Sequence, residues 1–211
     1  MFDLKTQFLS LILSLPALLT ALTVHEFAHG FVADKMGDPT ARYSGRLSLN
    51  PMDHMDLWGT ICLLFFHFGW AKPVPINPRN FRNSKWGTVA VSVAGPFANF
   101  LLALVCAFAY VGIMTLDPNK ITVFFGYIFY YGVQLNVGLM VFNLIPIPPL
   151  DGSKILMEFL PPKYRFKMYS MERYFSLILL ALIAFNVLTP VLSLFRGWVL
   201  ALINLIVGLV F

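Results

Sequence analysis

The chain has 211 residues, of which 58% are hydrophobic and only 12% are charged. Water-soluble domains usually carry about 25% charged residues and at most about half apolar residues, so this composition excludes a soluble protein. The formal charge of +5 is not gathered in a basic tail or block of the kind that binds nucleic acid. The length fits one domain, and the sequence therefore predicts a single all-α polytopic membrane protein in the lipid bilayer, with no nucleic-acid partner.

Long apolar stretches predict the membrane helices, because about 20 apolar residues are needed to cross a bilayer as a helix. The last stretch is long enough for two passes, and Thr189-Pro190 marks the turn of a C-terminal helical hairpin over about 172–211. A shorter run, 57–70, suits a re-entrant or interfacial segment better than a full crossing. We therefore expect about five transmembrane helices, in the stretches 7–32, 86–116, 122–142 and 174–211.

Two segments between the first and second membrane stretches favour extended backbone. Residues 41–49 alternate loosely between apolar and polar types, and residues 71–76 contain Pro73 and Pro75. Proline cannot donate a hydrogen bond to a sheet, so 71–76 fits only an edge strand. We expect short β segments at the membrane boundary, within one membrane-embedded domain 1–211 whose catalytic core spans about 7–160.

Lysine and arginine predict the orientation in the membrane, because cytoplasmic loops are enriched in both. Residues 34–85 and 154–173 contain all of them except Lys5, Lys120 and Arg196. Both basic segments should therefore face the cytoplasm. We expect a multi-pass protein of the cell membrane whose functional site lies towards the cytoplasmic side.

The sequence His-Glu-Phe-Ala-His at residues 25–29 is the strongest chemical feature. Positions four apart share one face of a helix, so His25 and His29 can bind one zinc ion. Glu26 projects nearby, where it can activate a water molecule. Three ionisable groups in an apolar helix are costly unless they face a cavity or a partner, which favours a metal site over two ordinary polar histidines.

A catalytic zinc commonly takes three protein ligands and keeps one position for water. Asp151 is the best candidate for the third ligand, because it follows a proline-rich break in a membrane helix, where a carboxylate is a functional site by default. An equally good interpretation is that Asp151 caps a helix over 152–160. The other candidates for the third ligand are His54, His67 and Glu158.

Several motifs in this order resemble those of the site-2 protease family, the M50 intramembrane metalloproteases. They are the His-Glu-Phe-Ala-His segment at 25–29, Gly-Pro-Phe-Ala-Asn at 95–99, and the run 143–152 that ends in Leu-Asp-Gly. The runs 46–60 and 69–75 resemble the compact prokaryotic branch of the family. The resemblance covers about residues 20–160.

This resemblance implies a zinc-dependent endopeptidase that cuts transmembrane protein or peptide substrates. It implies one Zn²⁺ per chain, held by His25, His29 and Asp151, with Glu26 as general base. Segment 71–76 would guide the substrate, and the PDZ and CBS modules of some larger relatives are not expected. The residues implied to bind the substrate or the reaction intermediate, or to lie beside the active site, are Gly95, Pro96, Asn99, Asn143 and His54.

Each of these secondary residues also has a structural interpretation. Gly95 and Pro96 could form a helix kink with a small-residue contact, Asn99 and Asn143 could link helices, and His54 could lie in a solvated loop. Two other functions would also place histidine and aspartate in a membrane. A metal transporter or chaperone would not need a glutamate between the histidines, and an inactive relative should have lost part of the catalytic set.

Overall fold

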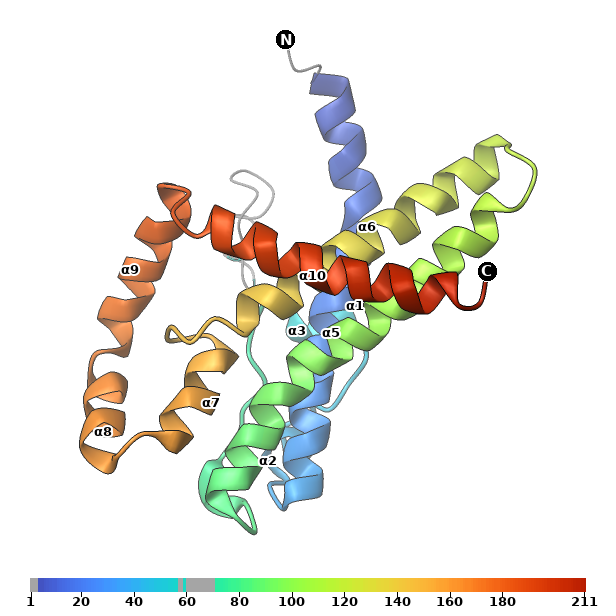
Figure 1. Ribbon diagram of the computed structural model, residues 1–211. Helices are drawn as coiled ribbons and strands as arrows, with labels where there is room; N and C mark the ends of the chain where they lie inside the picture. The colour runs from blue at the N-terminus through green and yellow to red at the C-terminus, as the bar shows by residue number, and fades with distance from the viewer. Residues whose placement is uncertain (1–3, 57–58, 60–70) are drawn as a thin grey trace. The chain divides into compact units, whose positions relative to one another are not determined.

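The computed structural model of the protein describes residues 4–56, 59 and 71–211, and within this part helices dominate (Figure 1). Four helices are long and apolar enough to cross a membrane, over Ile12–Met36, Ser84–Met114, Lys120–Asn143 and Thr189–Gly208. They confirm three of the predicted membrane stretches and the second half of the fourth. The helices are α1 (Leu4–Met36), α2 (Thr40–Tyr43), α3 (Pro51–His54), η1 (Pro78–Asn80), α5 (Ser84–Met114), α6 (Lys120–Asn143), α7 (Asp151–Phe159), α8 (Pro162–Ser170), α9 (Glu172–Ala184) and α10 (Thr189–Gly208).

The last apolar stretch forms two helices, α9 and α10, with Pro190 in the first turn of α10 and Asn186 at positive φ between them. Proline is favoured in a first helical turn and asparagine tolerates positive φ, which explains the break. α9 has 13 residues. At 1.5 Å per residue it is about 20 Å long, short of the roughly 30 Å hydrocarbon core. The described part of the chain therefore holds four helices of spanning length where five were expected.

The prediction of short β segments is wrong for the residues that the structure describes. Residues 40–43 form the helix α2, and a single antiparallel bridge joins Met55 to Ala71. Segment 71–76 makes its other hydrogen bonds to scattered groups and forms no strand ladder. Arg46 Nη2 donates to the Lys72 carbonyl at 2.8 Å, and the Lys72 amide donates to the backbone carbonyl of His54 at 2.8 Å. With its two prolines the segment has too few amide donors for a ladder. The predicted re-entrant run 57–70 lies outside the described residues, apart from Gly59.

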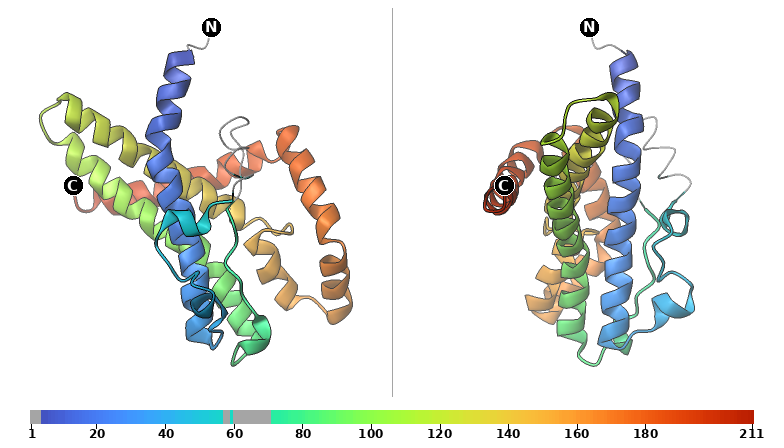
Figure 2. Two further views of the ribbon diagram at one scale, coloured as in Figure 1. Left: turned by 180° about the vertical axis from the view of Figure 1, so that it is seen from behind. Right: turned by 90° about the vertical axis from the view of Figure 1, so that its right-hand side faces the viewer.

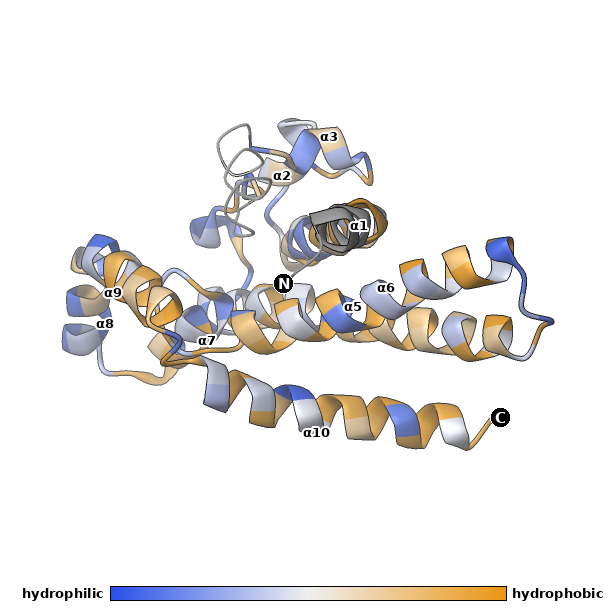
Figure 3. Ribbon diagram, turned by 90° about the horizontal axis from the view of Figure 1, so that it is seen from above, coloured by the Kyte–Doolittle hydropathy of each residue, from blue (hydrophilic) through white to orange (hydrophobic). Residues whose placement is uncertain are grey.

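Contacts within the chain form two compact units, of which the first contains residues 1–21, 99–142 and 182–211. There the second half of α5 lies beside α6, and α10 packs on both through apolar side chains (Figures 1 and 3). Small residues allow a close approach, because a Cβ on Gly132 would lie 2.6 Å from Cys106 Sγ. The buried side chains at this contact are Ala103, Cys106, Ala107, Val133, Val137, Val141, Ile203 and Val207.

Polar side chains also link helices inside this unit. Asn99 Nδ2 donates to the Ala21 carbonyl at 3.1 Å and to Asn136 Oδ1 at 2.8 Å, and both asparagines are fully buried. Arg196 of α10 donates to Gln134 of α6 at 3.0 Å. Buried amides in an apolar environment need such partners, so the two bonds of Asn99 hold α1, α5 and α6 together around this residue.

The second unit contains residues 22–98 and 143–181. In it the segment with α2 and α3 lies alongside the C-terminal half of α1 (Figure 2). The fully buried carboxylate of Asp38, just after α1, holds this segment together. It accepts hydrogen bonds from the Asn77 amide at 2.6 Å, from Asn80 Nδ2 at 2.8 Å, and from the amide and hydroxyl of Thr40. Asp38 therefore links the turn after α1 to the residues that directly follow segment 71–76.

These bonds predict how stability depends on pH. Burial raises the pKa of the Asp38 carboxyl, but the hydrogen bonds from Thr40, Asn77 and Asn80 outweigh burial and lower the pKa below its ordinary value. A carboxyl whose pKa is lowered on folding adds stability above its unfolded pKa of about 4, and that stability is lost as the pH falls through the folded value. We expect Asp38→Asn to lower the free energy of unfolding in detergent by about 2 to 3 kcal/mol at pH 7.

The difference between the wild type and Asp38→Asn should shrink below about pH 4, as the wild-type carboxyl becomes protonated. The exposed Asp117 provides the control, because Asp117→Asn should change the free energy of unfolding little at either pH. An equal stability of wild type and Asp38→Asn at pH 7 would contradict the assigned role.

Candidate active site

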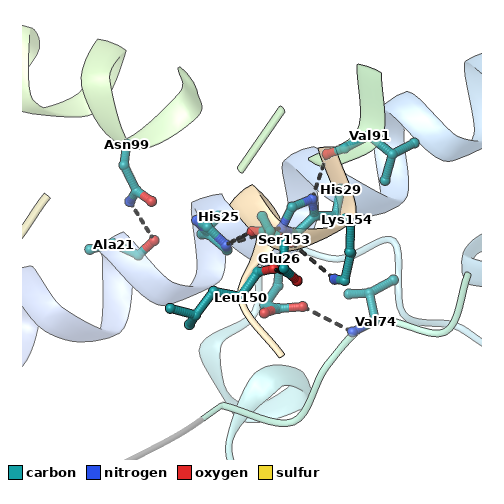
Figure 4. Close-up of polar contacts among 11 residues, drawn as sticks. Ala21, His25, Glu26, His29, Val74, Val91, Asn99, Leu150, Ser153 and Lys154 are labelled. Atoms are coloured by element: carbon teal, nitrogen blue, oxygen red, sulfur yellow. Dashed lines mark hydrogen bonds and ion pairs between the residues drawn. The ribbon is translucent and has the colours of Figure 1, made fainter. Parts of the chain in front are cut away.

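The two histidines of α1 lie one helical turn apart and turn their rings towards the same point (Figure 4). His25 and His29 are each 6% exposed, and their Nε2 atoms are 3.0 Å apart. His29 Nδ1 lies 2.7 Å from the Val91 carbonyl of α5. A carbonyl can only accept, so Nδ1 carries the proton and Nε2 presents its lone pair. A histidine that binds a metal through one ring nitrogen usually donates a hydrogen bond from the other, as His29 does here.

Asp151 brings a carboxylate to the same point. Its Oδ2 lies 3.3 Å from His25 Nε2 and 3.1 Å from His29 Nε2, and the residue is 4% exposed. Its other oxygen, Oδ1, accepts a hydrogen bond from Lys154 Nζ at 3.0 Å, and this neighbouring positive charge favours the ionised form of the carboxylate.

The alternative that Asp151 caps a helix is wrong. α7 begins at Asp151 itself, its N-cap is Leu150, and no side chain caps it. Among the other candidates for the third ligand, His54 Nε2 bonds to the Ser48 carbonyl at 2.8 Å and Glu158 pairs with Arg165 at 3.2 Å. His67 lies outside the described residues.

These three side chains fit a zinc ion. Around a tetrahedral zinc with bonds of about 2.0–2.1 Å, neighbouring ligand atoms lie about 3.3 Å apart. The three ligand atoms here are separated by 3.0, 3.1 and 3.3 Å. Two imidazoles and one carboxylate form a donor set that catalytic zinc accepts, with a fourth position for water or substrate. The site can therefore hold a zinc ion in an open coordination.

Two glycines allow this close convergence. A Cβ on Gly95 of α5 would lie 2.6 Å from both His25 Cε1 and His29 Nε2. A Cβ on Gly152 would lie 2.2 Å from the Leu144 carbonyl oxygen. Real Cβ atoms do not approach other atoms so closely, so any larger residue would displace the imidazoles or the turn that presents Asp151.

Glu26 lies between the two histidines in sequence and is half-buried. Its Oε2 accepts a hydrogen bond from the Val74 amide at 2.9 Å (Figure 4). Val74 belongs to segment 71–76, which Arg46 and Asp38 hold on either side. These contacts thus fix the orientation of the Glu26 carboxylate.

Comparison with known proteins supports this interpretation of the site. The model of peptidase family M50 matches residues 13–124 and 110–186. The chain belongs to peptidase family M50. A Bacillus subtilis protein named "Putative zinc metalloprotease YwhC" is 40% identical over 196 residues, which cover 90% of each chain.

More distant M50 relatives align over shorter lengths. "Putative zinc metalloprotease Rip2" of Mycolicibacterium smegmatis is 31% identical over 86% of this chain and 69% of its own length. "Putative zinc metalloprotease MJ0611" of Methanocaldococcus jannaschii is 28% identical over 69% of each chain. No solved structure matches significantly.

The other residues that the M50 motifs single out are Pro96, Asn99, Asn143 and His54, and they differ in burial and in hydrogen bonding. Pro96 is fully buried in α5 directly after Gly95, and Asn143 is the last residue of α6, before the proline-rich turn. Asn99 bonds to Ala21 and Asn136 in the first compact unit. His54 is 2% exposed, so it is not the solvated loop histidine of the structural alternative.

Sequence reasoning missed three contributors to the site. Lys154 donates to Asp151 at 3.0 Å, and its spacing of three residues on a helix was a usable signal. Val91 and Val74 contribute through a backbone carbonyl and a backbone amide. Backbone groups are the same in every residue, so no sequence signal identifies these two.

The role of Gly95 can be tested with a single methyl group. We expect Gly95→Ala to push the imidazoles apart and weaken zinc binding by tenfold or more, since each tenfold corresponds to only about 1.4 kcal/mol. Zinc affinity of the purified protein, measured by competition with a chromogenic chelator, checks this. The control is Gly138→Ala in α6, where a Cβ would meet nothing within 4 Å. Equal zinc affinity in wild type and Gly95→Ala would show that the imidazoles do not need this close approach.

Proposed function

We propose that this M50 peptidase is a zinc-dependent endopeptidase that hydrolyses peptide bonds within or near transmembrane segments of membrane proteins. The observation that carries the proposal is the convergence of His25, His29 and Asp151 in a chain with four helices of membrane-spanning character. Two of the three ligands lie on one of those helices, α1. A carboxylate and two imidazoles in such a helix region are costly without an ion to share.

His25, His29 and Asp151 would hold the zinc through three ligand atoms, and a fourth position would remain for a water molecule or the substrate carbonyl. Zinc supplies a Lewis acid there, which makes water more acidic and polarises a carbonyl. Val91 fixes the ring orientation of His29. The peptidase activity of the family and the zinc named in its relatives agree with this donor set.

Glu26 moves the proton. Its Oε2 is held by the Val74 amide, which leaves Oε1 as the oxygen that takes a proton from the attacking water. The same oxygen then gives the proton to the amine of the departing peptide. A hydrogen bond to one carboxylate oxygen fixes the direction of the other, so Val74 orients the base.

The substrate has to expose a peptide bond that a helix normally hides in its own hydrogen bonds. Local unwinding frees amides that need new acceptors at membrane depth. We propose that carbonyls of segment 71–76 accept them, because each carbonyl oxygen has two lone pairs. The amides of Lys72 and Val74 are already engaged, so the segment acts through its acceptors.

The proposed location is the cell membrane, with the site towards the cytoplasm. α1 ends at Met36, seven residues beyond His29, and leads into the basic segment 34–85. Positively charged loops favour the cytoplasmic side. Among the secondary residues, we propose that Asn143 and His54 lie near the substrate. The bonds of Asn99 to two helices favour a bridging role for that residue instead.

The role of Glu26 is tested by Glu26→Gln, which keeps the shape of the side chain and removes its basicity. We expect cleavage of a membrane-embedded reporter in proteoliposomes to fall by about 100-fold or more, with zinc content unchanged. The matched control is Glu172→Gln, at an exposed glutamate at the start of α9. Normal turnover by Glu26→Gln would refute its role as general base.

A further inference from the structure

The two oxygens of the Asp151 carboxylate have different partners. Oδ2 faces both imidazoles, at 3.3 and 3.1 Å from the Nε2 atoms of His25 and His29. Oδ1 accepts a hydrogen bond from Lys154 Nζ at 3.0 Å. Lys154 follows Asp151 by three residues on α7, a spacing that puts both side chains on one face of the helix.

We propose that Lys154 is a positioning residue that holds Oδ1 away from the metal, so that Asp151 offers zinc a single oxygen, Oδ2. This proposal rests on the zinc site proposed above. Carboxylates bind metal ions through one oxygen or through two. If both oxygens of Asp151 reached the zinc, the second would occupy the position that a catalytic zinc keeps for water or substrate.

The burial of the two side chains suits this role. The Asp151 side chain is 5% exposed, whereas that of Lys154 is 46% exposed. The lysine side chain is therefore partly solvated, while one N–H of its ammonium group bonds to the buried carboxylate. A charge-assisted bond of this kind is stronger than one between neutral groups and fixes the carboxylate plane.

A purely electrostatic role for Lys154 predicts the opposite effect on metal binding. A positive charge near the site repels Zn²⁺, so its removal alone should tighten zinc binding. Removal of a group that orients a metal ligand weakens binding, by about 10- to 100-fold for outer partners of metal ligands. The sign of the change in affinity thus separates the two roles.

The experiment compares zinc affinity in full-length wild type, Lys154→Met, Lys154→Arg and Lys163→Met by chelator competition in detergent. We expect Lys154→Met to bind zinc about 10- to 100-fold more weakly. Lys154→Arg keeps the donor and the charge and should bind within a few-fold of wild type. Lys163 is an exposed lysine of α8, so Lys163→Met should leave affinity unchanged.

Cobalt(II) in place of zinc gives a second measurement, because its visible absorption is strong for four ligands and weaker for five. We expect wild type and Lys154→Arg to show the strong spectrum and Lys154→Met to lose intensity as Oδ1 joins the metal. Unchanged or tighter zinc binding by Lys154→Met would overturn the proposal, and so would a four-coordinate cobalt spectrum of this variant that matches wild type. If wild type itself binds no stoichiometric zinc, the metal site fails, and with it the role of Lys154.

Discussion

The arrangement of the second unit depends on the buried contact of one Asp151 carboxylate oxygen with the imidazole nitrogens of His25 and His29. Oδ2 lies within 3.3 Å of both Nε2 atoms, and all three residues are at most 6% exposed. Buried polar groups are stable only when each has a partner. A zinc ion is a partner that all three can share, which explains why the surrounding structure is built to bring them together.

Several weak local constraints combine to make this meeting possible. The helix spacing of α1 aligns the two histidines, Gly95 leaves room for their rings, and Gly152 lets the proline-rich turn pack against the start of α7. Val91 sets the tautomer of His29. A helix, a turn and a backbone carbonyl therefore each contribute one geometric requirement, and none of them is sufficient alone.

The proposed general base, Glu26, is held by a separate part of the unit. Segment 71–76 presents the Val74 amide to Glu26, and that segment is held by Arg46 at one end and by Asp38, through Asn77, at the other. Stability of this loop region and orientation of the base are consequently linked. The proposed substrate-guiding carbonyls lie in the same segment, so substrate binding and proton transfer would depend on one short piece of backbone.

The membrane stretches and the histidine pair could be predicted because each depends on neighbouring residues. A run of apolar residues identifies a spanning helix, and a spacing of four positions places two histidines on one face of a helix. Asp151 and His25 are separated by more than 120 residues of chain, so their contact could not be read from local sequence. The capping alternative for Asp151 therefore stayed open. The predicted β segments did not form strands, because a polar turn after Asp38 starts the helix α2. The predicted fifth membrane helix failed for another reason: α9 is too short to span, which apolar composition alone did not reveal.

X-ray absorption at the zinc edge, on the zinc-loaded full chain in detergent, tests the central claim most directly. The account predicts one zinc per chain with four ligands at about 2.0–2.1 Å, two of them giving the multiple-scattering pattern of imidazole and two being oxygens. A spectrum with fewer than two imidazoles, or with the six oxygen ligands of a loosely bound surface ion, would contradict it.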